Sequence, residues 1–210
     1  MEIVIPIFDE LTALDAVGPY EVLSRLPGAE VKFAALEPGP KRTETKMLAL
    51  IADHALADVP RPDIVCVPGG FGTRQLMKDE AMLDWIRTAH EHSTWTTSVC
   101  TGSLLLGAAG VLEGLRATTH WLAMDTLAGL GVETTLERVV EQGKVITAAG
   151  VSSGIDMALT LAAHVAGPEV AQAIQLAIEY DPQPPFDAGS PEKAPKEIVE
   201  RMRRGGAEAA

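Results

Sequence analysis

Short runs of β-branched and aliphatic residues alternate along this chain with longer segments of helical periodicity. The runs and segments that follow one another in the first half are 2–7, 13–26, 30–36, 63–67, 79–92, 94–99 and 101–111. Parallel strands must be joined by crossover connections, and these connections usually carry a helix. The alternation therefore predicts an α/β fold in which one doubly wound, mostly parallel sheet is flanked by helices.

The rest of the chain is less regular. A short strand is expected after the turn at 38–40, and the later elements are a strand, a helix, two strands joined by a turn at 141–144, and two helices. These expected elements are 47–51, 116–120, 121–130, 138–149, 153–166 and 168–180. No repeat or change of composition marks a domain boundary, so we expect a single domain over 1–190. Residues 191–210 are predicted to be a charged extension, helical or frayed.

The charge balance limits the partners. The 210 residues include 17 Lys and Arg against 29 Asp and Glu, a net charge of −12. Repulsion from phosphates argues against nucleic acid and an anionic membrane surface as direct partners. The chain also shows no apolar run typical of a signal peptide or a membrane span. We therefore expect a cytoplasmic protein that acts on a small molecule or contacts another protein.

Cys66 and Cys100 are the only cysteines. Two thiols cannot build a disulfide framework or a four-thiolate zinc site, and no His, Asp or Glu spacing is typical of a metal site. The sequence therefore predicts no metal and no cofactor. Cys66 lies inside the apolar run 63–67, so we interpret it as a buried structural residue.

Cys100 stands where a predicted strand runs directly into a helix, and Gly102 follows two residues later. A sharp turn of this kind projects a nucleophile above the carboxyl edge of a sheet. The first amides of a helix carry partial positive charge, which favours a thiolate. The position predicts a nucleophile, although a free cysteine is more commonly a small buried apolar residue.

A glycine-rich loop follows the preceding strand, at Pro68-Gly69-Gly70-Phe71-Gly72. Parallel strands share one carboxyl edge, so this loop opens on the same side of the sheet as Cys100. The amides of Gly69 and Gly70 are candidates for holding a developing negative charge, and Phe71 is a candidate pocket residue. The alternative is a plain turn between a strand and a helix.

Asp15 and His120 are the candidate proton carriers. Asp15 follows the first strand between apolar neighbours, so it is either an ordinary acid in the first turn of a helix or a buried carboxyl with a raised pKa. His120 ends a predicted strand and is followed by Trp121. It could pair with Cys100 or line the pocket, but a histidine packed by the tryptophan is an equally open interpretation.

Five stretches together resemble the ThiJ/PfpI superfamily, and within it the bacterial members that hydrate isonitriles. They are LDAVGP (14–19), CVPGG (66–70), SVCTGS (98–103), RATTHW (116–121) and a Pro-rich segment within 173–191. The resemblance implies a flavodoxin-like, class I glutamine amidotransferase-like fold and a homodimer, with the C-terminal helices as part of the interface.

The resemblance also implies an activity, the hydration of an isonitrile to an N-substituted formamide through a thioimidate. Cys100 is then the nucleophile, Asp15 moves the protons, Thr101 orients both groups, and Gly70 lines the pocket. Relatives with protease or deglycase activity carry His directly after the cysteine, and Thr101 at that position argues against a peptidase. Two alternatives remain: a regulatory or redox-sensing domain without turnover, and a thiol-dependent hydrolase of another small electrophile.

Overall fold

The computed structural model describes the backbone of residues 1–208 and the side chains of residues 1–205. The chain forms two compact units, Met1–Ile178 and Glu179–Ala210. The first unit holds the sheet and every candidate site residue. The second contains one helix, α8 (Lys196–Glu208), within the segment expected to be a charged extension.

The central sheet has seven strands in the order β10-β11-β7-β6-β1-β2-β5. Every neighbouring pair is parallel except β10 and β11, which form the antiparallel edge. The strands of this sheet are β1 (Glu2–Pro6), β2 (Glu30–Ala35), β5 (His54–Ala55), β6 (Ile64–Val67), β7 (Trp95–Val99), β10 (Val139–Gln142) and β11 (Val145–Ala148). The doubly wound, mostly parallel sheet predicted from the sequence is confirmed.

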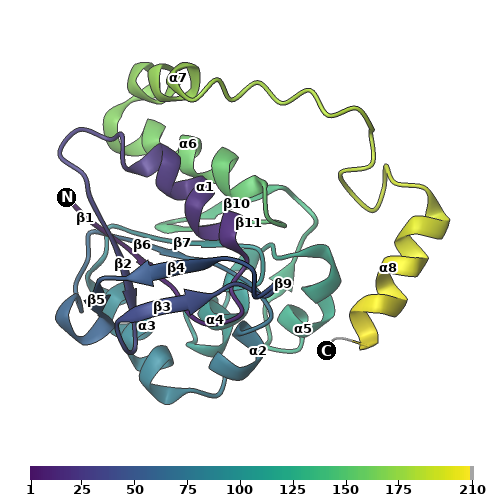
Figure 1. The fold of residues 1–210 in the computed structure, drawn as a ribbon, viewed down its shortest axis with the longest axis horizontal. Helices are drawn as coiled ribbons and strands as arrows, with labels where there is room; N and C mark the ends of the chain where they lie inside the picture. Colours follow the sequence, from purple (N-terminus) through teal and green to yellow (C-terminus); the bar gives the residue numbers. More distant parts are fainter. Residues whose placement is uncertain (209–210) are drawn as a thin grey trace. The chain divides into compact units, whose positions relative to one another are not determined.

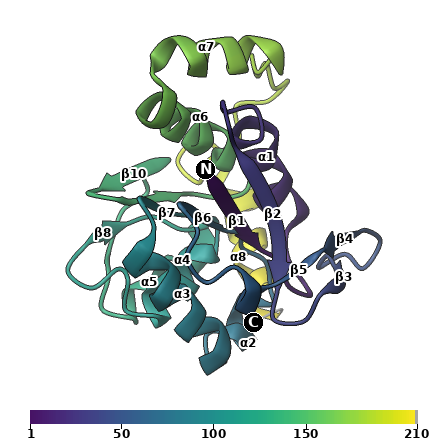
Figure 2. The same ribbon diagram turned by 90° about the vertical axis from the view of Figure 1, so that its left-hand side faces the viewer.

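Helices cover both faces of this sheet. The helices of the first unit are α1 (Ala13–Leu23), α2 (Thr73–Leu76), α3 (Glu80–His92), α4 (Gly102–Ala108), α5 (Met124–Ala128), α6 (Ser153–Ala166) and α7 (Pro168–Ala177). Helices α1 and α6 pack together on one face, while α3, α4 and α5 lie on the other (Figures 1 and 2). The central strands are buried on both faces, which explains why β6 is an unbroken apolar run rather than an alternating one.

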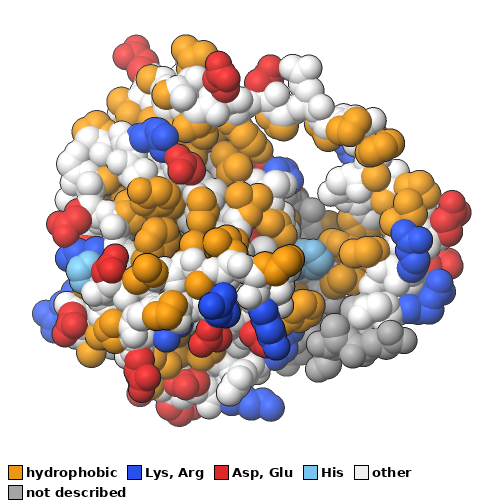
Figure 3. Space-filling view, in the orientation of Figure 1, with side chains coloured by type: hydrophobic (Ala, Val, Ile, Leu, Met, Phe, Trp, Pro, Cys, Tyr) orange, Lys and Arg blue, Asp and Glu red, His pale blue; other side chains and the backbone are white. Residues whose placement is uncertain are grey.

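Two predicted elements differ from the structure. The expected strand at 47–51 is one half of an antiparallel hairpin, β3 (Gly39–Arg42) and β4 (Ala49–Ala52), so the expected turn at 38–40 lies partly inside β3. The hairpin presents Met47, Leu48 and Ile51 to solvent, on a face where hydrophobic side chains gather (Figure 3).

The second difference concerns the segment around His120. The strand expected at 116–120 stops early: β8 (Arg116–Ala117) pairs only with β9 (Glu133–Thr134), and a 3₁₀ turn at Trp121–Ala123 follows. Thr118 and Thr119 are buried but pair with side chains and carbonyls of the central sheet region instead of a neighbouring strand. A short β-branched run does not reveal by itself which partner its backbone will find.

No helix within the described residues is long and apolar enough to cross a membrane.

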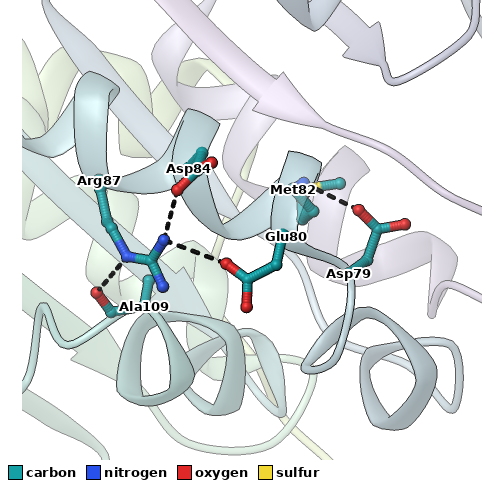
Figure 4. Close-up of polar contacts among 6 residues, drawn as sticks. All are labelled: Asp79, Glu80, Met82, Asp84, Arg87 and Ala109. Carbon is teal, nitrogen blue, oxygen red and sulfur yellow. Dashed lines mark hydrogen bonds and ion pairs between the residues drawn. The ribbon is translucent and has the colours of Figure 1, made fainter.

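The start of α3 and its contact with the end of α4 are shown in Figure 4. The Asp79 side chain accepts a hydrogen bond from the Met82 amide at 3.0 Å, which caps the helix. Further along α3, Arg87 donates through Nε to the Ala109 carbonyl at 3.2 Å, just beyond the last turn of α4. Nη1 of Arg87 pairs with Glu80 and Asp84. The bond from Arg87 to Ala109 holds α3 against the helix that begins beside Cys100, while the other contacts stabilise α3 itself.

Removing the cap should destabilise the fold measurably. We expect Asp79→Ala to lower the free energy of unfolding by about 1 kcal/mol, because the Met82 amide loses its acceptor. The matched control is Asp84→Ala, which removes an exposed ion pair and should change the stability by less than about 0.5 kcal/mol. Urea unfolding followed by circular dichroism measures both, and equal effects would contradict the role of the cap.

Candidate active site

Cys100 lies at the turn between β7 and α4, with a backbone φ of 55°. A positive φ is uncommon for a residue with a side chain, and at Cys100 it is held from both sides. The amide donates to the carbonyls of Ala148 and Ala149 at 3.0 and 2.9 Å. The carbonyl accepts from the hydroxyls of Ser103 at 3.2 Å and Thr119 at 3.0 Å. The sharp turn expected at Cys100 is present.

Gly102 allows this turn to pack against the end of β6. A Cβ atom at Gly102 would lie 2.1 Å from the Val67 carbonyl oxygen, which is far inside contact distance. Glycine therefore lets the first turn of α4 approach the strand that leads into the glycine loop, and the loop is brought beside the cysteine.

Asp15 is fully buried in the first turn of α1. Its Oδ2 accepts a hydrogen bond from the Gly69 amide at 3.0 Å. Oδ1 is buried and accepts none from a nitrogen or oxygen donor in the part of the chain that the structure describes. Burial raises the pKa of Asp15 to about 7, while hydrogen bonds from the Gly69 amide and the Cys100 thiol oppose this shift and the charge of Glu44 adds to it. The sequence left open whether Asp15 is an ordinary helix-start acid or a buried carboxyl with a raised pKa, and the structure supports the second.

The surroundings of the Cys100 thiol raise its pKa, whereas the sequence analysis expected them to lower it. Burial raises its pKa far above the ordinary value, and the neighbouring charge of Asp15 raises it further. The amides of Thr101 and Val151 point toward the sulfur and lower the pKa, but by less. Burial and the carboxyl therefore oppose the thiolate expected from the sequence, and only the amides near the start of α4, a helix of 7 residues, act in its favour. The pair consists of a thiol whose pKa is raised and a carboxyl whose pKa is raised to about 7.

The glycine loop has a different geometry from the one expected. The Gly69 amide is bonded to Asp15, and the Gly70 amide donates to the Thr101 hydroxyl at 2.9 Å. Neither amide is free to hold a developing charge, so the oxyanion role expected for them is replaced by a positioning role. A Cβ at Gly69 would lie 2.5 Å from the Thr101 nitrogen, and Gly70 has a φ of 132°. Both positions therefore require glycine.

Thr101 connects the loop to the cysteine. Its hydroxyl accepts from the Gly70 amide and donates to the Gly70 carbonyl at 3.2 Å. The hydroxyl thus holds the loop rather than the Asp15 carboxyl, while the backbone amide of Thr101 faces the Cys100 sulfur.

His120 and Phe71 are the two candidate pocket residues expected from the sequence. His120 Nδ1 accepts from the Leu122 amide at 3.3 Å, and the ring packs on Gly150, where a Cβ would lie 2.7 Å from Cδ2. Burial lowers the pKa of His120, and the charge of Arg74 lowers it further, so the imidazole is neutral. Its ring also lies 6.0 Å from that of Trp121. This is the packed histidine, and the described contacts include no hydrogen bond between His120 and Cys100. Phe71 is 45% exposed.

Four further residues reach the site and were not expected from the sequence. Arg74 donates to the Gly70 carbonyl, the Thr12 hydroxyl donates to Glu44 at 3.1 Å, and the Val151 amide faces the thiol. Glu44 belongs to the β3–β4 hairpin, and Val151 to the turn after β11. Only Arg74, four residues after Gly70, stood near enough to a recognised motif to be found.

A cavity of about 400 Å³ opens elsewhere on the same edge of the sheet, near the ends of β1 and β2. Its lining includes Phe8, Glu10, Leu36, Lys41 and Gly72 but neither Cys100 nor Asp15. Among the described residues, no three His, Cys, Asp or Glu side chains converge as metal ligands.

A strained cysteine between a parallel strand and a helix, with a buried carboxyl in the same site, defines a class: α/β proteins with a cysteine at a sharp turn on the carboxyl edge of a doubly wound sheet. The chain belongs to the DJ-1/PfpI family, whose sequence model matches residues 1–164. The resemblance drawn from the sequence motifs is therefore confirmed.

Individual relatives agree with this placement. An isonitrile hydratase of Pseudomonas putida is 46% identical over 198 residues, which are 94% of this chain and 86% of the relative. The crystal structure of a ThiJ/PfpI family protein from Pseudomonas syringae superposes with a TM-score of 0.95 at 35% identity, covering 99% of this chain and 86% of that one. The transcriptional regulator CdhR of Pseudomonas aeruginosa is 30% identical over 173 residues, 80% of this chain but only 51% of its own length.

The pKa of Asp15 predicts a pH-dependent stability. Between pH 3.8, its ordinary pKa, and about 7, the folded chain keeps a proton that the unfolded chain releases. Stability from this group therefore falls as the pH rises through that window, by about 1.4 kcal/mol per pH unit. Asp15→Asn removes the effect and keeps an oxygen that can accept from the Gly69 amide. The quantity to compare is the unfolding free energy of Asp15→Asn minus that of the wild type. We expect this difference to be about 2–3 kcal/mol larger at pH 8 than at pH 5.

Urea unfolding at the two pH values measures this difference. The exposed Asp125 in the first turn of α5 provides the control Asp125→Asn, with changes below about 0.5 kcal/mol at both pH values. A difference for Asp15→Asn that does not depend on pH would contradict the raised pKa.

Proposed function

We propose that this chain is an isonitrile hydratase, a hydro-lyase that converts R–N≡C and water into the formamide R–NH–CHO. The observation that carries the proposal is the fully buried Asp15 carboxyl, which is held by the Gly69 amide and interacts with the Cys100 thiol at the strained turn between β7 and α4. The identity of 46% to an isonitrile hydratase, spread over 94% of the chain, supports the same reaction.

The first step needs a nucleophile and a proton for the same carbon. We place Cys100 as the nucleophile and Asp15 as the proton carrier. As sulfur bonds to the terminal isonitrile carbon, the ionised Asp15 takes the thiol proton and passes it to that carbon, giving the thioimidate R–N=CH–S–Cys. A carboxyl of pKa about 7 suits this role, because at neutral pH it is present in both forms and can accept a proton and then donate it.

The second step adds water. Asp15 accepts a proton from water as the oxygen bonds to the thioimidate carbon, and it passes this proton to the nitrogen to give R–NH–CH(OH)–S–Cys. The C–S bond of this adduct then breaks, the hydroxyl proton is transferred to the sulfur, and the formamide and the thiol are released. The net reaction consumes one water and needs no oxidant, reductant or cofactor.

The surrounding groups position this pair. The Gly69 amide fixes one oxygen of Asp15 and leaves the other directed to the reaction. The amides of Thr101 and Val151 stabilise negative charge on sulfur when it leaves in the second step. The Thr101 hydroxyl keeps the glycine loop in place. We assign Phe71 and His120 to the wall of the substrate pocket.

A regulatory domain is the second candidate, favoured by the match to CdhR over half of that protein's length. A sensor would depend on oxidation of Cys100, and susceptibility to oxidation follows thiolate character. The match to 86% of the length of an isonitrile hydratase, against 51% of the length of CdhR, favours turnover over sensing.

Two cysteine variants test the reaction. Cys100→Ala should lower kcat for hydration of an aromatic isonitrile by at least about 10³-fold, since it removes the nucleophile. Cys66→Ala is the matched control: Cys66 is equally buried in the adjoining strand, and its variant should retain most of the wild-type rate. Formamide appearance followed by absorbance measures both, with circular dichroism confirming the fold. No formamide from the wild type at high enzyme concentration would overturn the proposal in favour of a sensor.

We also propose that the chain forms a homodimer in the cytoplasm, where a free catalytic thiol stays reduced. The β3–β4 hairpin supports the dimer, because Met47 is 85% and Ile51 61% exposed. Leu176 in α7 is 78% exposed, which supports a contribution from the C-terminal helices. Large exposed apolar side chains that gather on one face are typical of protein interfaces.

A charge in the hairpin tests the dimer. Ile51→Glu should shift the molar mass from dimer to monomer, since burying the carboxylate would be unfavourable. Leu136→Glu, at a side chain 55% exposed before β10, is the control and should leave the mass unchanged. Light scattering coupled to size exclusion measures the mass, and a monomeric wild type would contradict the proposal.

A further inference from the structure

We propose that Arg74 binds an anionic group of the substrate, so that the preferred isonitriles carry a negative charge such as a carboxylate. This inference rests on the proposed function and specifies the substrate class for the same site. It is drawn from the position of the Arg74 guanidinium and from its lack of a carboxylate partner among the described side chains.

Arg74 lies in α2, directly after the glycine loop. Its Nη1 donates to the Gly70 carbonyl and to the Thr73 hydroxyl, both at 3.2 Å. The same Gly70 carbonyl accepts from the hydroxyl of Thr101, the residue after the nucleophile. The Gly70 carbonyl oxygen is therefore shared by the guanidinium of Arg74 and the hydroxyl of Thr101, the residue next to Cys100.

The guanidinium has donors to spare. Arginine carries five N–H groups, and both recorded bonds of Arg74 use Nη1 and end on neutral oxygens. Within the part of the chain whose side chains are described, no carboxylate lies within 4.0 Å of Arg74. Four other arginines pair with at least one carboxylate: Arg25, Arg87, Arg116 and Arg138. Arg74 is partly buried, and a hydrogen bond between charged groups is stronger where water is partly excluded.

The charged and titratable groups that interact with Arg74 do not replace an anionic partner. Glu44 and the ionised form of Cys100 interact electrostatically with the guanidinium, and the charge of Arg74 acts on His120. Glu44 forms no ion pair with it and is bonded to the Thr12 hydroxyl instead. His120 is neutral, so Arg74 is the cation of this neighbourhood. Because the chain carries a net charge of −12, a local cation beside the thiol decides whether an anion can approach.

Phe71 adds an apolar surface to the cation. Its ring lies 5.6 Å from the guanidinium carbon of Arg74 and is partly exposed to solvent. A cation and an exposed ring beside one thiol suit a ligand with an organic body and an anionic end. The isonitrile carbon would meet Cys100 while the anionic end meets Arg74.

Two probes test the inference. The first compares an uncharged aromatic isonitrile with the same ring bearing a carboxylate. In Arg74→Gln, kcat/KM for the carboxylate should fall about 10- to 100-fold further than kcat/KM for the uncharged compound, mainly through KM, because a charge-assisted hydrogen bond is lost. Arg74→Lys should recover part of this loss. The control is the exposed Arg61→Gln, which should behave as the wild type with both compounds.

The second probe does not depend on isonitrile turnover. Alkylation of Cys100 by iodoacetate, an anion, is compared with alkylation by uncharged iodoacetamide, using mass spectrometry of the Cys100 peptide. Arg74→Gln should lower the ratio of the two rates about tenfold relative to the wild type and to Arg61→Gln.

The outcomes separate the two proposals. Equal losses for charged and uncharged isonitriles, or an unchanged alkylation ratio, would show that Arg74 acts only on the glycine loop or the thiol and would overturn this inference. Hydration of neither isonitrile by the wild type would overturn the proposed function. In that case a lowered alkylation ratio in Arg74→Gln would still establish Arg74 as an anion site beside the thiol.

Discussion

The hydrogen bond from the Gly69 amide to the buried Asp15 carboxyl is the contact on which the site depends. It joins the first helix to the loop after β6, and the next residue of that loop joins Thr101 through the Gly70 amide. Three segments distant in the sequence are thereby held around one sulfur. Because a Cβ at Gly69 would overlap Thr101, the approach is possible only for glycine. The amides of the loop position the acid and the residue after the cysteine instead of being free to bind a ligand.

Burial then sets the chemistry. Exclusion of water raises the pKa of both Asp15 and Cys100. The two groups also interact with each other, which lowers the pKa of Asp15 and raises that of Cys100. A site arranged in this way places a base beside the cysteine before an electrophile arrives. The Arg74 guanidinium adds a positive charge, and it contacts the same Gly70 carbonyl as the Thr101 hydroxyl.

Several features of the site were predictable because they are local. The strand-to-helix junction at Cys100, the glycines after β6 and the apolar flanks of Asp15 can each be seen within a few residues, and the structure has the turn, the close approach and the buried carboxyl. The direction of the pKa shift of Cys100 was mispredicted, because the helix N-terminus is visible in the sequence while the depth of burial is not. The free amides expected at Gly69 and Gly70 failed for the same reason: their acceptors, Asp15 and Thr101, lie 54 and 31 residues away.

By itself, the sequence determined the order of strands and helices, the position of the nucleophile and the family, since these follow from periodicity and short motifs. The tertiary structure alone decided which groups share the site: the Glu44 hairpin, the Val151 amide, the packed His120 and the unpaired Arg74. Their proximity depends on how strands pair and how helices pack across the sheet, and long-range contacts of this kind leave no signal in the neighbouring residues. Electrostatics depends on that proximity and on burial, so the state of the thiol and the charge offered to a substrate were set only by the folded chain.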